Sequence, residues 1–149
     1  MRIPRHKQRG CAPGIQTTLP PKKPDDSMYL KTDYSFTDKI HILSVLKNKL
    51  EEAYPNSIES VILFGSQATN TATEFSDYDI LIRLKTDYSR SDENRILDIC
   101  FDVDIEYDIL IDAHLLSNDE LNSKRGRQPI FVNALKNGIY ISTRGQFVP

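Results

Sequence analysis

Several residue types are scarce in this sequence, and long apolar runs do not occur; each of these features excludes a class of protein. Among 149 residues there is no tryptophan, there are two cysteines and six glycines, and no run of 18 apolar residues occurs. Two cysteines are too few for a disulfide framework, and a chain without a long apolar run has no membrane-spanning helix. We therefore expect a cytoplasmic protein, without contact to a membrane, in which Cys100 is a buried, inert thiol.

Acidic residues are missing from the start of the chain. Residues 1–24 carry six basic side chains and no acid, whereas the remainder carries 13 basic and 21 acidic side chains. Residues 1–27 also hold five of the eight prolines and show no apolar periodicity, which predicts a disordered basic extension. Two explanations stay open: a true start at Met28, or a tail for phosphates or an acidic partner. Because the extension has no aromatic residue to stack on a base, we do not expect direct nucleic-acid binding.

Apolar periodicity after residue 28 predicts alternating helices and strands. Leu43, Leu46 and Leu50 recur at helical spacing and begin this series. The elements expected next are a strand at 58–64, a short helix after Gly65-Ser66, a strand at 78–84, a helix at 91–107, a strand at 109–116, a helix at 129–137 and a strand at 139–142. This order predicts an α/β or α+β fold, with a small mixed β-sheet flanked by helices, over residues 28–142. Residues 143–149 are expected to form a flexible tail.

Gly65-Ser66 directly follows the apolar segment 58–64. A glycine there lets the backbone turn sharply and lets a ligand approach the main chain. Ser66 would begin a short helix, whose free N–H groups favour phosphate oxygens. The same two residues also suit an ordinary turn and helix cap, so alone they do not identify a site.

Asp77 and Asp79 open the predicted strand at 78–84. Residues two apart on a strand point to the same side. Two carboxylates at ~4 Å repel each other by roughly 4 kcal/mol for an effective dielectric constant near 20, so a cation between them is favoured. Mg²⁺, which takes carboxylate oxygens, water and phosphates, suits such a pair. A polar loop before the strand is the alternative.

A third acid is expected on the strand at 109–116. Asp112 lies within this apolar run, where a carboxylate needs a partner or a cation. Asp108 and Asp104 are the reserves, and we expect most of the acids on the preceding helix to face solvent. His114 lies two residues beyond Asp112 and could aid proton transfer, but a core histidine is the favoured interpretation.

With these residues the chain resembles the DNA polymerase β-like nucleotidyltransferase superfamily. Gly65-Ser66, ten residues and then Asp77-x-Asp79 match its signature. The resemblance is greatest to the minimal nucleotidyltransferases encoded beside HEPN-domain proteins in prokaryotes. It extends over residues 28–142 and is also carried by the segments 96–102, 105–107 and 129–138.

This resemblance implies a nucleotidyltransferase fold and a set of site residues. Gly65 and Ser66 would hold a nucleoside triphosphate, with ATP as the donor. Asp77 and Asp79 would bind two Mg²⁺ ions, and Asp112 would complete the metal site and help to activate the attacking hydroxyl. The implied reaction is an in-line displacement at the α-phosphate that releases pyrophosphate.

The resemblance also implies a partner, a HEPN-domain toxin. Some relatives act as antitoxins by transferring AMP from ATP to a tyrosine of the toxin, and the acidic body of this chain would suit a basic partner. The alternatives are a non-catalytic antitoxin that only binds the toxin, and a transferase acting on a small molecule such as an antibiotic.

Some positions depart from the family pattern. Many members carry arginine after Gly-Ser and Arg-Gly shortly beyond, where this chain has Gln67, Asn70 and Thr71. Positive charge near the triphosphate is thereby reduced, which motivates the non-catalytic alternative. The basic run 124–127 could contact phosphate or a partner, but a solvated loop is favoured.

Overall fold

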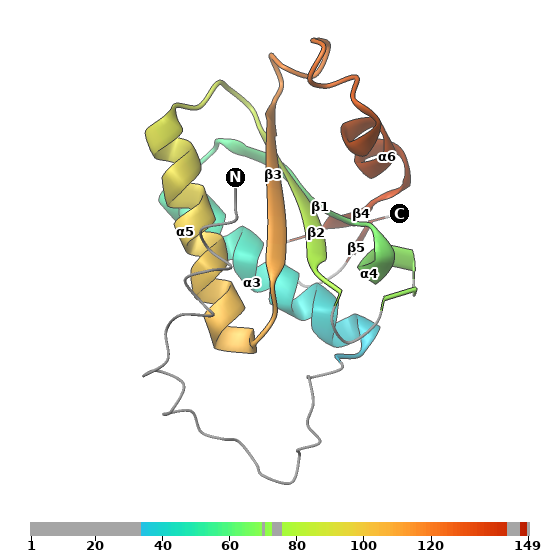
Figure 1. Cartoon of the computed structure of the whole chain (residues 1–149). Helices are drawn as coiled ribbons and strands as arrows, with labels where there is room; N and C mark the ends of the chain where they lie inside the picture. Colours follow the sequence, from blue (N-terminus) through green and yellow to red (C-terminus); the bar gives the residue numbers. More distant parts are fainter. Residues whose placement is uncertain (1–33, 70, 73–75, 143–146, 149) are drawn as a thin grey trace, which may run out of the picture. The chain divides into compact units, whose positions relative to one another are not determined.

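A mixed β-sheet with helices on both faces forms this protein, as seen in a computed structural model (Figure 1). The structure describes four segments of the chain: residues 34–69, 71–72, 76–142 and 147–148. The predicted extension 1–27 lies outside these residues, and so do positions 143–146 and 149 of the predicted tail. The two tail residues that are described belong to a strand.

The order of elements confirms the predicted mixture of helices and strands. In chain order they are α3 (Phe36–Ala53), β1 (Ile58–Phe64), α4 (Ser66–Thr69), β2 (Tyr78–Leu84), α5 (Arg90–Tyr107), β3 (Ile111–Ser117), α6 (Pro129–Asn137), β4 (Ile139–Ile141) and β5 (Phe147–Val148). The sheet has the order β3-β2-β1-β4-β5. Strands β2 and β3 are parallel, whereas the other neighbouring pairs are antiparallel. The predicted small mixed sheet flanked by helices is therefore confirmed.

Local capping explains where the long helices begin. The hydroxyl of Ser35 accepts a hydrogen bond from the N–H of Asp38 and so caps α3. Ser89 and Asp92 form a reciprocal capping box at the start of α5. Pro129 occupies the first turn of α6, where its missing N–H costs nothing.

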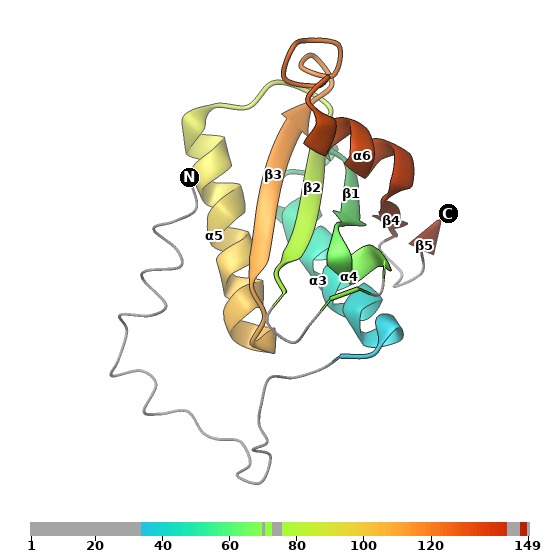
Figure 2. The same cartoon turned by 45° about the vertical axis from the view of Figure 1, so that its right-hand side comes forward.

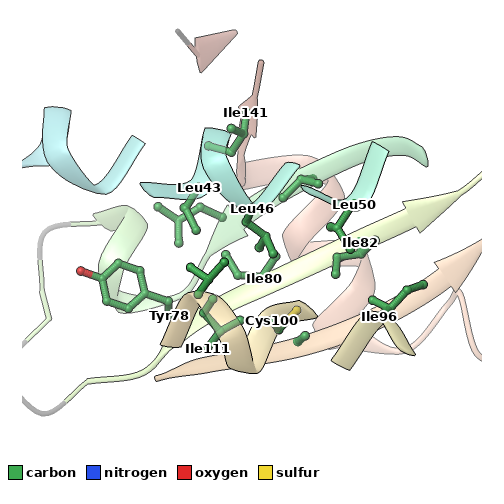
Figure 3. Packing of buried hydrophobic residues seen from close by; sticks show 14 of the residues in the cluster. Leu43, Leu46, Leu50, Tyr78, Ile80, Ile82, Ile96, Cys100, Ile111 and Ile141 are labelled. Atoms are coloured by element: carbon green, nitrogen blue, oxygen red, sulfur yellow. The ribbon is translucent and has the colours of Figure 1, made fainter. Parts of the chain in front are cut away.

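Two hydrophobic clusters fill the two faces of the sheet. Helices α3 and α5 pack on one face, where the predicted core leucines Leu43, Leu46 and Leu50 are fully buried (Figure 3). Cys100 is buried in the same cluster as a free thiol, as expected. Helix α6 covers part of the opposite face (Figure 2), where the cluster consists of Ile62, Phe64, Leu81, Leu116, Phe131 and Ala134.

The basic run 124–127 is exposed at Lys124 and Arg127, whereas Arg125 also contacts the body of the domain. The Arg125 guanidinium donates a hydrogen bond of 2.8 Å to the carbonyl of Leu115 and lies 4.8 Å from the ring centroid of Phe131. Its Nε is 3.1 Å from a carboxylate oxygen of Glu120. Because β3 is an edge strand, this contact helps to cover a carbonyl on its open side, to which the Tyr88 hydroxyl also donates a hydrogen bond. The loop is solvated as predicted, and Arg125 in addition contacts the β-sheet side of the domain.

None of the helices in the described part of the chain combines the length and apolar character needed to cross a membrane.

Candidate active site

The predicted site residues meet where β1 ends and where β2 and β3 begin. Because β1 is antiparallel to β2 and β2 is parallel to β3, these three strand ends lie side by side (Figure 2). In the register of the sheet, Phe64 pairs with Asp79, and Asp79 pairs with Asp112. Two acids that are 33 positions apart in the sequence thus become direct neighbours on adjacent strands.

Gly65 brings the turn after β1 against the carboxylate of Asp79. Its φ is +76°, in the left-handed region that favours glycine. A Cβ at this position would collide with the Asp79 carboxylate and lie 3.1 Å from its Cγ. Glycine is therefore needed twice, for the backbone conformation and for the space beside Asp79. Ser66 follows, half-buried, as the first residue of α4.

His114 joins Asp79 and Asp112 in a compact group. One ligand atom from each of these side chains lies within 4.8 Å of the other two. The His114 Nε2 is 3.7 Å from Asp112 Oδ1, and the two side chains are 23% and 32% exposed. All three are half-buried, so the group is accessible from solvent at one end of the sheet.

Burial and the neighbouring acids raise the pKa of Asp79. The pKa of Asp79 is raised from 3.8 to about 6, mainly by burial and then by the charge of Asp112, with a smaller contribution from Asp77. The interaction with His114 lowers the pKa of Asp79. Holding carboxylates close together costs free energy, and a divalent cation bound between them removes this repulsion. These residues therefore fit a metal ion.

Asp77 lies just before β2 and is half-buried. The N–H of the next residue, Tyr78, donates a hydrogen bond of 2.8 Å to the carbonyl of Leu110, which fixes the start of β2 against β3. Asp77 is not among the three side chains whose ligand atoms lie within 4.8 Å of one another in the described chain. Its charge nevertheless acts on Asp79, so it belongs to the surroundings of the same site.

The two reserve acids have other positions. Asp104 is 0% exposed, and its Oδ1 accepts a hydrogen bond of 2.9 Å from the N–H of Ile111. Asp104 is therefore not one of the solvent-facing acids of α5, because its carboxylate anchors the first residue of β3. Asp108 is exposed and caps the end of α5 in the left-handed conformation, with φ +56°.

Of the residues that depart from the family pattern, the structure describes Gln67 and Thr71. Gln67 is 5% exposed, and its Nε2 donates a hydrogen bond of 3.1 Å to the carbonyl of Ser76. It thereby ties α4 to the segment that leads into Asp77. Thr71 is exposed and its hydroxyl is 2.9 Å from that of Thr69, while Asn70 lies outside the described residues.

The sequence favours a core position for His114, with a role beside Asp112 as the alternative, because the two residues lie on the same side of a strand. The structure places His114 half-buried beside Asp79 and Asp112, which agrees with the alternative. Nothing in the sequence indicates that Gln67 would turn inward and donate a hydrogen bond to the backbone nine residues further on.

The nucleotidyltransferase domain model matches residues 43–141, which include every residue of this site. The chain belongs to this family. The prediction of a nucleotidyltransferase is thus confirmed, and the match begins within α3 and ends at the last residue of β4.

Three proteins of Methanocaldococcus jannaschii, each named "putative protein adenylyltransferase", are similar to this nucleotidyltransferase. The first is 33% identical over 61% of this chain and 85% of its own length. The second is 34% identical over 56% of this chain and 58% of its own length. The third is 33% identical over 48% of this chain and 73% of its own length. Among solved structures, a crystal structure of a "putative nucleotidyltransferase" from Sulfolobus solfataricus has a TM-score of 0.42 and 19% identity, over 59% of this chain and 79% of that chain.

Proposed function

We propose that this nucleotidyltransferase transfers AMP from ATP to a hydroxyl group of a partner protein, and that the partner is a HEPN-domain toxin. The observation that carries the proposal is the convergence of Gly65, Asp79 and Asp112 at one end of the sheet. The name shared by the three similar archaeal proteins supports a protein as the acceptor. The net charge of the chain after residue 24, which has 13 basic and 21 acidic side chains, suits a basic partner.

The residues have separate tasks in this reaction. Gly65 lets the turn after β1 lie directly against Asp79, and Ser66, which begins α4, would offer a hydroxyl and an N–H to the oxygens of the triphosphate. Asp77, Asp79 and Asp112 would hold the divalent ions, Mg²⁺ by the family resemblance. Such ions neutralise charge on the α-phosphate and on the leaving pyrophosphate.

Asp112 has a second task beside the acceptor. Its side chain is 32% exposed, more than that of His114, and lies on an edge strand next to Asp79. A carboxylate in this place can accept the proton of the attacking hydroxyl. The α6 face of the sheet then limits the approach of water from one side, since Phe64 and Phe131 are buried there.

Transfer of label tests this proposal. The protein is incubated with ATP labelled in the α-phosphate, a divalent metal and a HEPN-domain protein encoded beside it. We expect label on the HEPN-domain protein with the wild type and none with Asp79→Asn. Asp98→Asn, which removes an exposed acid of α5, is the matched control and should retain transfer. If no label is transferred, or if Asp79→Asn transfers as much as the wild type, the proposal is wrong.

A non-catalytic antitoxin is the second candidate, and the position of Gln67 favours it. Glutamine is neutral, and this side chain is buried and bonded to the backbone, so the position supplies neither a positive charge nor an exposed side chain to the triphosphate. Co-expression with the toxin separates the two functions. If a variant with both Asp77→Ala and Asp79→Ala still protects cells, binding alone accounts for neutralisation.

A further inference from the structure

The group formed by Asp79, Asp112 and His114 has dimensions that suit a single small cation. A ligand atom lies roughly 2.1 Å from a small divalent ion, so two ligands of one ion are at most about 4.2 Å apart. The three ligand atoms here are within 4.8 Å of one another. Small side-chain rotations therefore bring all of them onto one ion without moving the strands.

The imidazole of His114 is held in place by aromatic rings. Its ring centroid is 6.0 Å from that of Phe64 and 6.3 Å from that of Phe131, the latter in an edge-on arrangement. Its Nε2 is 3.7 Å from Asp112 Oδ1, which is too long for a hydrogen bond but falls within the span of two ligands on one ion. Two aromatic contacts thus fix the imidazole with one nitrogen beside the carboxylates.

A nitrogen in this set changes which ion it prefers. Mg²⁺ takes oxygen ligands almost exclusively, whereas imidazole favours transition metals. Mn²⁺ accepts carboxylates and water as Mg²⁺ does, but binds nitrogen ligands more strongly. We propose that His114 is a direct nitrogen ligand of the ion bound by Asp79 and Asp112, and that this site binds Mn²⁺ more tightly than Mg²⁺. The inference rests on the proposed nucleotidyl transfer only in that it concerns the same site.

Binding of the metal alone tests this inference, without nucleotide or acceptor. Pulsed electron paramagnetic resonance of bound Mn²⁺ detects coupling to a directly coordinated ¹⁴N. We expect this coupling in the wild type and in His41→Gln, which removes an exposed histidine of α3, and we expect it to be absent in His114→Gln. Calorimetric titrations with Mn²⁺ and with Mg²⁺ measure the preference of each variant.

The affinities should change unequally. Loss of an outer partner of a metal ligand already weakens binding by about 10–100-fold, so loss of the imidazole should weaken Mn²⁺ binding by at least about tenfold. Mg²⁺ binding should change much less, because water can replace the nitrogen. A thermal melt shows whether His114→Gln is folded. If it is not, a variant with both His6→Gln and His41→Gln, in which His114 is the remaining histidine, decides by the presence or absence of ¹⁴N coupling.

Absence of ¹⁴N coupling in the folded wild type with bound Mn²⁺ overturns the inference. The inference is also overturned if His114→Gln weakens the binding of Mn²⁺ and of Mg²⁺ equally, since the imidazole would then act only through packing. The result is independent of transfer. A protein that shows the coupling but labels no partner would contradict the proposed function and leave the metal assignment standing. A protein that labels the partner but shows no coupling would contradict the metal assignment and leave the proposed function standing.

Discussion

Replacing Asp79 by asparagine should make the metal-free protein more stable at pH 8. The pKa of this carboxyl is raised from 3.8 to about 6 in the folded state, chiefly by burial and by the charge of Asp112. Between these two values the folded chain binds more protons than the unfolded chain, so stability falls as the pH rises through this window. The cost is absent well below pH 3.8 and complete above pH 6. Asparagine keeps the size of the side chain and removes the charge that carries the cost.

The size of the effect follows from the pKa. One pKa unit corresponds to about 1.4 kcal/mol, so the upward shift of about two units gives an upper limit of roughly 3 kcal/mol. Asp79 is only half-buried, and solvent screening reduces this limit. We expect Asp79→Asn to raise the free energy of unfolding by about 1 kcal/mol at pH 8, and by much less at pH 4.5.

Urea unfolding in the presence of a chelator measures this difference at both pH values. Asp98→Asn is the matched control, because it removes an exposed acid of α5 away from the site. Addition of Mn²⁺ or Mg²⁺ should reverse the order, since a cation that binds only the folded wild type stabilises it. A loss of stability in metal-free Asp79→Asn at pH 8, or an equal gain at both pH values, would refute the reasoning.

Three further substitutions probe the supports of the site. Gly65→Ala should lower the free energy of unfolding by about 1–2 kcal/mol, because alanine is strained in the left-handed backbone conformation. The added methyl group should also displace Asp79 and so weaken metal binding, which a metal titration measures. Gln67→Met keeps the buried volume but loses the hydrogen bond to Ser76, so kcat should fall while the melting temperature changes little; an unchanged kcat would contradict this role. Asp104→Ala should cost about 1–3 kcal/mol in urea unfolding, because it leaves a buried backbone N–H without its acceptor, whereas Asp104→Asn should cost less.

Local features of the sequence determined the elements and half of the site. Apolar spacing places α3 and β1, and capping residues such as Ser35 mark helix starts, since these signals act within a few residues along the chain. Gly65 and the pair Asp77-x-Asp79 are recognisable for the same reason, because a turn and a strand alternation are local properties.

Only the tertiary structure decided which distant residues complete the site. The sequence favours Asp112 over Asp104 and Asp108 because Asp112 lies in an apolar run. Only the parallel register of β2 and β3 shows that Asp112 lies beside Asp79, while Asp104 is buried under the start of β3. The inclusion of His114 depends on the same register and on packing against α6. Strand pairing between segments more than 30 positions apart depends on the packing of the whole core, so the composition and spacing of one segment do not reveal it.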